Sequence, residues 1–418
     1  MITTMLRVLL TRSFQPIAFE KPISSSEPVW GEETAPVGLY VHIPFCRELC
    51  PFCPYQKVAY DSIKAEEFVK ALLAEIRMSA ALEGRRLKIS SVYFGGGTPA
   101  LLLEKLGSIL EAIDEGYERT GECGIELHPS DVTPEALNQL RQMGFTMVSL
   151  GIQSFQPRCL NVLGRADKAG AERVRLAATA GFRTIDVDLI FGMQGQTEEE
   201  LIADFRIACE MGATQISTYP FIDFSYAHNR TKPLGHGSKR KLLACLNMQA
   251  DRSGWERTSV WTFARRNTPK YSSITRDLFR GFGPSAVTLT RTSFCVNTFS
   301  VDEYIKAMSK EQSVAALELR FTKRLRALYW LFWSAYTLKL DGRAFQALNG
   351  RSLEEMFPVE LRLARLAGLI RRAGVDYRLT RRGAALYHRL EQVYTHGYID
   401  KTWKAAREDP WPSSIRLH

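Results

Sequence analysis

The sequence predicts an α/β fold in which parallel strands form a partial (β/α)6 barrel of the TIM type, followed by a smaller α+β domain. Three observations support this prediction. From Gly38 onward, short apolar segments alternate with amphipathic segments of helical period, a pattern typical of parallel sheets. Gly144, Gly181 and Gly212 follow predicted helices, where helix C-caps are expected. Finally, 418 residues are more than one compact domain usually holds.

Six segments fit buried strands, and five fit the helices that connect them. The expected strands cover residues 39–43, 91–94, 124–127, 147–150, 184–190 and 215–219. The expected helices cover residues 63–82, 101–117, 133–143, 168–180 and 197–211. Cap residues and early carboxylates support the starts of the third and fifth helices. Because the six units follow one another along the chain, we expect an open or closed barrel rather than a two-winged sheet.

The chain divides into three expected parts: an arm or linker (1–36), the barrel domain (37–310) and a basic domain (315–418). Within the last part, residues 361–390 have the pattern helix, turn, hairpin, helix, which resembles a winged helix. Most of the net charge of +10 lies in this domain. A basic surface can bind nucleic acid or an anionic substrate. Because no nucleic-acid motif accompanies it, an arginine-rich solvated surface is the favoured interpretation.

The cysteines and the apolar segments bear on the compartment. Eight cysteines, scattered singly apart from the first three, do not form a disulfide framework and suit a reducing cytosol. No apolar segment reaches the roughly 18–20 residues that span a bilayer. The first residues are weakly signal-like, but Arg7 interrupts them and no small-residue cleavage site follows. We therefore expect a cytoplasmic protein without a membrane partner.

Three cysteines lie in one short loop directly after the first expected strand. Their spacing, Cys46-x3-Cys50-x2-Cys53, brings three soft thiolates within reach of one inorganic cluster. Iron–sulfur clusters are usually held by four thiolates, so three predict a cluster with one iron left open for a ligand. A zinc site and three unrelated core thiols are the alternatives.

Further polar motifs follow the later strands, and reactive groups gather at this end of a barrel. Gly95-Gly-Gly-Thr-Pro99 allows close approach of a ligand to free amides, or is only a tight turn. Glu126 is expected to accept from an ammonium or ribose, whereas His128 beside it is expected to be structural. The remaining strand-end candidates are Gln153 as a neutral donor and acceptor, Arg165 as a carboxylate fork or surface residue, and Asp188 as a buried, partnered carboxylate. Together these groups match S-adenosylmethionine.

In this order the motifs resemble the radical S-adenosylmethionine superfamily, in the branch of oxygen-independent coproporphyrinogen oxidase. The resemblance covers residues 38–225 and extends to a similar C-terminal domain. It implies a [4Fe–4S] cluster on Cys46, Cys50 and Cys53, and an electron donor such as flavodoxin or ferredoxin. It implies a first S-adenosylmethionine near Tyr40, Gly96, Gly97, Thr98, Glu126, Gln153, Arg165 and Asp188. Phe52 matches a position that packs near a second S-adenosylmethionine in this branch.

The sequence also departs from the branch. Porphyrinogen-oxidising members carry another cysteine two residues after the third ligand, where this chain has Tyr55. Residues 270–286 lack the haem-related residues of the haem-chaperone members, and Gln194 replaces the usual proline of the fifth motif. What remains is similar to the class C radical methyltransferases and to the cyclopropane-forming enzymes of duocarmycin-type antibiotic biosynthesis.

That resemblance implies transfer of a methyl or methylene carbon from one S-adenosylmethionine to an sp2 carbon of an aromatic or heteroaromatic natural product. A 5′-deoxyadenosyl radical from the other S-adenosylmethionine would start the reaction, and a separate methyltransferase is a further candidate partner. Tyr219 and Asp223 are candidates for proton transfer or for pocket lining, and residues 271–276 are expected near the mouth. Two alternatives remain: a haem-binding or haem-chaperone protein, and a radical enzyme that modifies porphyrin or haem.

Overall fold

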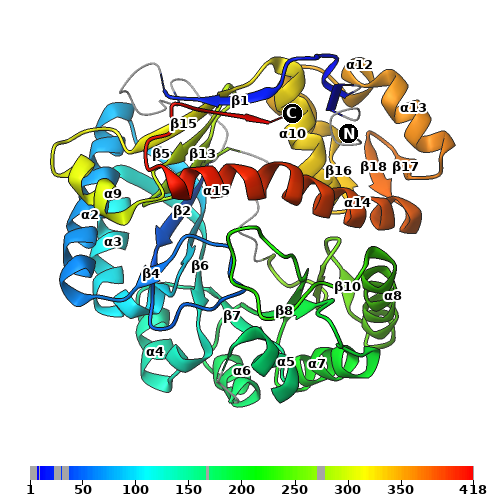
Figure 1. Cartoon of the computed structure of the whole chain (residues 1–418), viewed down its shortest axis with the longest axis horizontal. Helices are drawn as coiled ribbons and strands as arrows, with labels where there is room; N and C mark the ends of the chain where they lie inside the picture. The colour runs from blue at the N-terminus through cyan, green and yellow to red at the C-terminus, as the bar shows by residue number, and fades with distance from the viewer. Residues whose placement is uncertain are drawn as a thin grey trace.

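The computed structural model describes residues 7–8, 10–22, 30, 37–165, 169–270 and 278–417. One fourteen-stranded sheet runs through the described part of the chain, in the order β10-β11-β9-β8-β7-β6-β5-β2-β12-β13-β14-β15-β1-β19. Figure 1 shows a curved sheet with helices such as α2, α3, α6 and α7 on its outer side. The expected mixed α/β barrel fold is confirmed.

Six neighbouring strands pair in parallel and follow chain order, as the sequence predicts. They are β2 (Val37–Ile43), β5 (Leu87–Gly96), β6 (Tyr117–Leu127), β7 (Met147–Gln153), β8 (Thr184–Phe191) and β9 (Gln215–Pro220). The expected helices between them are α2 (Ser62–Glu83), α3 (Leu103–Gly116), α4 (Pro134–Gln142), α6 (Gly170–Thr179) and α7 (Glu198–Glu210). Two further helices, α5 (Pro157–Leu163) and α8 (His236–Arg252), were not predicted. All six carboxyl ends therefore meet at one rim of the barrel.

The rest of the sheet is mostly antiparallel. β12 (Phe279–Phe282) pairs in parallel with β2, and β13 (Val287–Leu289), β14 (Ser293–Asn297) and β15 (Ala315–Arg320) follow in antiparallel order. β11 (Thr262–Ala264) and β10 (Glu256–Arg257) extend the opposite edge beside β9. Near the chain ends, β1 (Ile17–Glu20) pairs with β19 (Ser414–Leu417). A strand thus lies within the expected arm, while the division into three domains stays a prediction.

A helical unit with a β-hairpin follows the sheet. Its elements are α10 (Lys323–Tyr336), β16 (Lys339–Leu340), α11 (Gly342–Asn349), α12 (Leu353–Met356), α13 (Pro358–Leu366), β17 (Ile370–Ala373) and β18 (Asp376–Leu379). β17 and β18 form the hairpin that the sequence predicts as a wing. Trp330, Phe345, Phe357 and Tyr377 form a small core of their own.

A long helical segment then crosses the barrel opening. It consists of α14 (Arg381–Tyr394), one π-helical turn, η3 (Thr395–Ile399), and α15 (Asp400–Glu408). Figure 1 shows it, coloured red, between the β1–β15 side and the β8–β10 side of the molecule. The Asp400 carboxylate accepts the backbone amide of Ser225, and the Lys239 ammonium donates to the Gln392 amide oxygen. In the described residues, no helix combines the length and apolar character that crossing a bilayer requires.

Glu75 of α2 joins the parallel half of the barrel to the antiparallel strands. Its side chain is buried and accepts the Gly283 amide at 2.8 Å, the Tyr304 hydroxyl at 2.6 Å and the Asn297 amide at 3.0 Å. Gly283 has a φ of +95°, and a Cβ there would lie 2.4 Å from the His42 carbonyl oxygen. Glu75 therefore fixes a glycine turn against the end of β2, beside the cysteine loop.

Replacing Glu75 with leucine is expected to lower the free energy of unfolding by about 2–4 kcal/mol, because the Gly283 amide and the Tyr304 hydroxyl lose their acceptor in a buried place. Urea unfolding followed by circular dichroism measures the change, with E67Q on the exposed face of the same helix as the control. An E75L protein as stable as E67Q would contradict this role.

Candidate active site

The cysteine loop is closed at its base by two short strands. β3 (Phe45–Cys46) pairs in parallel with β4 (Val58–Ala59), so Cys46 lies opposite Ala59. Cys46 is buried, Cys50 and Cys53 are partly buried, and all three are free thiols. The Cys53 amide donates to the Cys50 carbonyl at 3.3 Å, which folds the loop back on itself. Three thiols therefore lie on one short, closed loop, although the described residues hold no group of three or more His, Cys, Asp or Glu side chains close enough together to bind a metal ion.

Polar groups approach two of these thiols. The Thr98 hydroxyl lies 3.8 Å from Cys46 Sγ, and a guanidinium nitrogen of Arg165 lies 3.5 Å from Cys50 Sγ. Burial raises the pKa of Cys46 to about 11 and also raises the pKa of Cys53, although Lys57 partly opposes the second shift. Cluster binding must therefore displace protons from these thiols. Three sulfur donors with hydrogen-bond donors and cations around them fit a bound iron–sulfur cluster.

The glycines after β5 allow close packing. A Cβ at Gly96 would lie 2.5 Å from the His42 ring, and one at Gly97 would lie 2.5 Å from the Phe45 carbonyl oxygen. The Gly97 amide donates to Ile43 and the Thr98 amide donates to Phe45. The expectation that these amides are free for a ligand is therefore wrong, because the cysteine-loop backbone already occupies them. The glycines instead let β5 press against that loop.

Tyr40 and His42, on the same face of β2, connect the barrel interior to the cysteine loop. The Tyr40 hydroxyl lies 3.0 Å from His42 Nδ1, and His42 Nε2 lies 2.9 Å from the Gln56 carbonyl oxygen. A carbonyl only accepts, so Nε2 carries the proton and Nδ1 accepts from tyrosine. Burial lowers the pKa of His42 to about 4, which keeps the ring neutral. His42 thus holds the end of the loop in place.

Glu126 ends β6 inside the barrel. Its carboxylate accepts the Tyr93 hydroxyl at 2.7 Å and the Gly96 amide at 3.1 Å. Burial raises the pKa of Glu126, while these two hydrogen bonds oppose the shift. A Cβ at Gly95 would lie 2.9 Å from the carboxylate, so a glycine there makes room for it. Glu126 can accept from a ligand only beside these existing donors.

Two aspartates of β8 face the same interior. Asp188 accepts the Ser149 hydroxyl at 2.8 Å, which confirms that it is partnered. Asp186, two residues earlier, is buried, and one of its oxygens accepts from Gln215 and Ser217. Its other oxygen has no hydrogen-bond partner among the described residues. Burial raises the pKa of Asp186 to about 7, and burial followed by the Asp186 charge raises that of Asp188.

The fourth motif brings one residue to the cysteine loop and another to the barrel rim. Gln153 ends β7 with a φ of +68°, in the left-handed region. Arg165 follows α5 and donates to the Gly151 carbonyl at 2.9 Å while its other terminal nitrogen faces Cys50. Arg165 therefore lies against the cysteine loop, and its role as a carboxylate fork stays a prediction.

The remaining candidates lie farther around the rim. Phe52 packs on an apolar cluster beneath the loop, made of Cys159, Leu163, Ile190, Met193 and Phe221. Tyr219 ends β9, and its pKa is raised by burial and then by Asp188. Asp223 accepts from the Asn229 amide at 2.7 Å and pairs with the Lys232 ammonium at 3.0 Å. Residues 271–276 lie outside the described residues. The proton-transfer roles of Tyr219 and Asp223 stay predictions.

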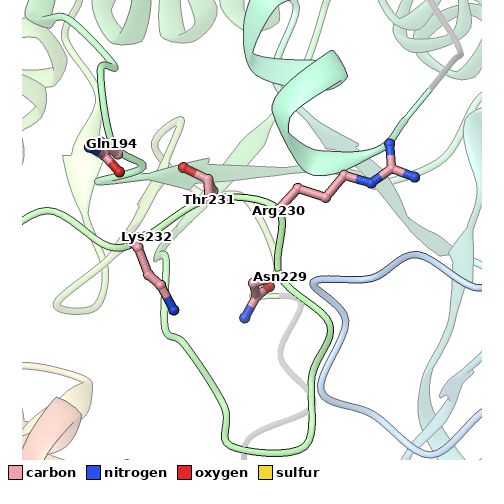
Figure 2. Close-up of a pocket in the computed structure, with 5 residues that line it drawn as sticks. All are labelled: Gln194, Asn229, Arg230, Thr231 and Lys232. Atoms are coloured by element: carbon pink, nitrogen blue, oxygen red, sulfur yellow. The ribbon is translucent and has the colours of Figure 1, made fainter.

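A shallow pocket of about 220 Å³ lies beside Asp223. Its lining residues are Gln194, Asn229, Arg230, Thr231 and Lys232. Figure 2 shows Arg230 directed toward α5, away from Lys232 and Asn229. Because Lys232 and Asn229 already contact Asp223, little unpaired charge faces this pocket.

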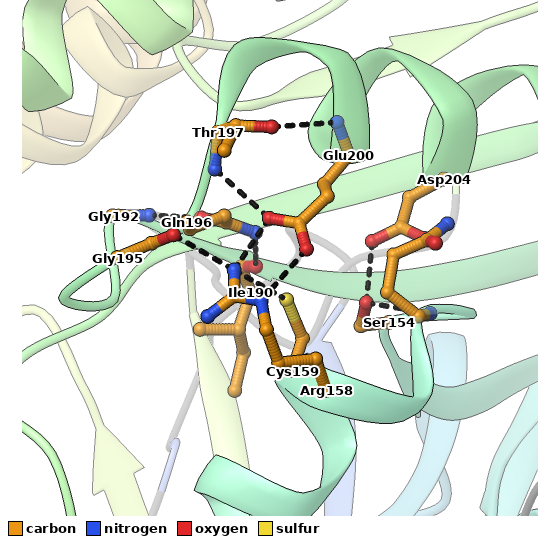
Figure 3. Close-up of polar contacts among 11 residues, drawn as sticks. Ser154, Arg158, Cys159, Ile190, Gly192, Gly195, Gln196, Thr197, Glu200 and Asp204 are labelled. Atoms are coloured by element: carbon orange, nitrogen blue, oxygen red, sulfur yellow. Dashed lines mark hydrogen bonds and ion pairs between the residues drawn. The ribbon is translucent and has the colours of Figure 1, made fainter.

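The turn after β8 is braced by side chains, as Figure 3 shows. The Gln196 amide oxygen accepts the Gly192 amide at 2.7 Å, and Arg158 donates to the Gly195 carbonyl at 2.8 Å. Thr197 and Glu200 form a capping box at the start of α7, and Glu200 also pairs with Arg158. The turn is therefore ordered with glutamine at 194, where the family pattern has proline.

Sequence reasoning missed four site residues: His42, Tyr93, Ser149 and Asp186. The strand pattern could have identified them, because every second residue of a strand lies on the same face. His42, for example, is two residues from Tyr40 and therefore shares its face. Tyr93 and Ser149 likewise lie on strands whose last residues carry the chosen motifs. Of the expected residues, Glu126 lies within electrostatic range of both Tyr40 and Asp188, while a shared ligand site for the full set stays a prediction.

Comparisons with known proteins agree with this geometry. Residues 40–208 match the model of the radical SAM superfamily. The haem chaperone HemW of Mycobacterium tuberculosis is 32% identical over 197 residues. This alignment covers 45% of the present chain and 50% of that relative, so it spans half of the relative's length. HemW of Bacillus subtilis is 26% identical over 369 residues, 83% of this chain and 96% of the relative.

Coproporphyrinogen oxidases form the second group of relatives. The oxygen-independent coproporphyrinogen III oxidase of Bradyrhizobium diazoefficiens is 27% identical over 325 residues, 70% of this chain and 72% of the relative. The structure of coproporphyrinogen III oxidase HemN from Escherichia coli superposes with a TM-score of 0.73 at 23% identity, over 87% of this chain and 90% of that one. The second match shows the shared fold.

These relatives overturn the expected transfer of a methyl or methylene carbon to a natural product. The expectation rested on Tyr55 in place of the oxidase cysteine and on the missing haem-chaperone residues. The absence of both features is not evidence for carbon transfer. Methyltransferase, cyclopropanation and antibiotic-biosynthesis assignments have no support among these relatives. The haem and porphyrin alternative agrees with them better.

The superfamily uses a [4Fe–4S] cluster and S-adenosylmethionine, and the cysteine loop and polar rim fit both. Its members also need an electron donor and a small-molecule substrate. Residues 40–208 are therefore similar to the radical S-adenosylmethionine superfamily, and the chain's relatives include haem chaperones and oxygen-independent coproporphyrinogen oxidases.

Proposed function

We propose that this chain is a radical S-adenosylmethionine protein that binds haem. One observation carries the proposal: similarity to B. subtilis HemW extends over 83% of this chain and 96% of that relative. It therefore includes the C-terminal region as well as the cluster-binding half. Tyr55, where porphyrinogen-oxidising members carry cysteine, favours haem binding over porphyrinogen oxidation.

In this proposal Cys46, Cys50 and Cys53 hold the cluster, which supplies one electron to cleave S-adenosylmethionine. Glu126 and Asp188 accept from the cationic and hydroxyl groups of the first S-adenosylmethionine, while Tyr93 and Ser149 orient their carboxylates. Tyr40, Gly96, Gly97, Thr98, Gln153 and Arg165 complete the surroundings of that ligand. Phe52 is the candidate contact of a second S-adenosylmethionine.

A second candidate function is a radical enzyme that acts on a porphyrin. The interior geometry favours it, because Tyr55 retains 50% of its surface accessible while Glu126, Cys53 and Asp188 all influence its hydroxyl. The exposed surface belongs to the rest of the residue, whereas the hydroxyl itself is buried, and this burial is the main cause that raises the pKa of Tyr55, with Glu126 next. A substrate at the rim would therefore meet Tyr55 beside the cofactor groups. Flavodoxin or ferredoxin stays the predicted reductant.

Haem titration separates the two candidates. Reconstituted protein is expected to bind about one haem per chain, seen as a saturating shift of the haem absorbance, with little 5′-deoxyadenosine formed on porphyrin addition. Porphyrin-dependent release of 5′-deoxyadenosine would instead establish the enzyme. A protein that binds neither haem nor porphyrinogen would contradict both candidates.

Replacing Cys50 with alanine is expected to abolish 5′-deoxyadenosine formation and to lower bound iron from about four per chain, because only two cluster thiolates remain. Iron analysis and chromatography of products after reduction measure both effects. C245A is the matched control, since Cys245 lies on α8, outside the cysteine loop. Unchanged iron and product in C50A would rule out this ligand set.

The affinity for S-adenosylmethionine is expected to rise as the pH rises from about 6 to about 8. Burial raises the pKa of Asp186 to about 7, so this carboxyl loses its proton within the interval, and a cationic ligand prefers the ionised form. Burial and the Asp186 charge also raise the pKa of Asp188. Equilibrium dialysis of reconstituted protein across this interval measures the effect.

Two variants test the source of this pH dependence. D186N should flatten the rise, because it removes one titrating carboxylate and its influence on Asp188. E111Q, which changes an exposed carboxylate on α3, should retain the wild-type profile. Affinity that stays constant with pH in the unmodified protein would show that these carboxylates do not face the ligand.

A further inference from the structure

The cysteine loop ends in a segment that α15 holds from outside. Arg407 donates to the Pro54 carbonyl at 2.7 Å and to the Gln56 side-chain oxygen at 2.8 Å. These two acceptors stand one and three residues after Cys53. Arg407 and Gln56 are 351 residues apart in the sequence. The last helix of the chain therefore contacts the exit of the loop directly.

Aromatic rings enclose the Arg407 guanidinium. Its central carbon lies 4.7 Å from the centre of the Tyr226 ring and 5.8 Å from that of Phe299. The Tyr226 hydroxyl also donates to the Pro54 carbonyl, at 3.3 Å. A planar guanidinium can stack on rings and still donate to two acceptors, which an ammonium cannot reproduce. Arg407 is therefore held in one orientation.

The same face of α15 makes two further contacts with the rim. Trp403 stacks on Phe224 at 6.4 Å and lies 5.8 Å from the Tyr55 ring. Asp400 accepts both the amide and the hydroxyl of Ser225. Asp400, Trp403 and Arg407 are spaced so that they share one side of a helix. The helix is thus fixed along its length before it reaches the loop.

Gln56 is bound from both sides. Its backbone carbonyl accepts from His42 of β2 at 2.9 Å, and its side chain accepts from Arg407 of α15. The loop exit is therefore clamped between the first barrel strand and the last helix. The positive charge of Arg407 also interacts favourably with Cys53 when that thiol is ionised.

We propose that Arg407 is a positioning residue for the cluster, and that α15 completes the cluster site by clamping the loop at Pro54 and Gln56. Loss of the clamp would free the segment that carries Cys53, so the loop would open more often and the cluster would be released faster. This inference goes beyond the proposed function, because it depends on neither haem nor porphyrin.

Thiol alkylation of the cluster-free, reduced protein tests the clamp without any cofactor. In R407M, Cys53 is expected to react with iodoacetamide roughly tenfold faster. This factor corresponds to a decrease of about 1.4 kcal/mol in the free energy that keeps the loop closed. Removing the charge alone would slow the reaction, because it disfavours the thiolate. Faster alkylation therefore reports access, and mass spectrometry of the Cys53 peptide measures it.

Two controls accompany this variant. K404M removes an exposed positive charge from the same helix and should leave Cys53 unchanged. Cys245 on α8 serves as an internal reference, since it should react equally in every folded variant. R407K keeps the charge, but its single nitrogen lacks the fork that reaches both acceptors from separate nitrogens and cannot stack as a planar group, so an intermediate rate at Cys53 is expected.

Iron release from reconstituted protein to a chelator provides a second readout, expected to be several-fold faster in R407M than in K404M. Equal alkylation and iron release in R407M and wild type would overturn the proposal. If R407M also makes the buried Cys123 of β6 reactive, it is unfolded, and R407K then decides. An accelerated Cys53 in R407K supports the clamp, and wild-type rates in both readouts overturn it.

Discussion

The shape of the cysteine loop has to be imposed from outside, and much of the barrel rim is arranged to do this. Between β3 and β4 the loop has no regular secondary structure. Gly96 and Gly97 allow β5 to press against its base, Arg165 reaches it from α5, and His42 holds its exit. Gly283, fixed by Glu75, packs in turn against the carbonyl of His42. Cluster geometry is thus tied to both halves of the sheet.

Burial of charge is the second constraint on this site. Glu126, Asp186 and Asp188 share one interior, and burial raises the pKa of each. Such a grouping destabilises the ligand-free fold once the carboxylates ionise, because buried charges need partners. Tyr93, Ser149 and Ser217 supply only part of that need. A cationic ligand would complete it, so the interior is better suited to a bound sulfonium and ammonium than to an empty state.

Local sequence patterns predicted the barrel well, and long-range pairings poorly. The six parallel strands follow from apolar periodicity, and the capping box at Thr197 marks the start of α7. By contrast, nothing near Ile17 indicates that β1 pairs with β19 at the other end of the chain. The Arg407 contact with Gln56 leaves no local pattern either. Free amides at Gly97 were wrongly expected for the same reason, since their acceptors belong to a different strand.

Tyr55 explains why the sequence could place the chemistry and yet misjudge its substrate. The residue lies two positions after a cluster ligand, with Glu126 and Asp188 within electrostatic range and the Trp403 ring 5.8 Å away. It therefore stands where these polar groups meet α15, a helix that lies outside the residues 40–208 that match the superfamily model. The side chains around Tyr55 come from α15 and from the loop after β9, far from the cysteine loop in the sequence. The meaning of a missing cysteine therefore depends on residues that no motif near position 55 reveals.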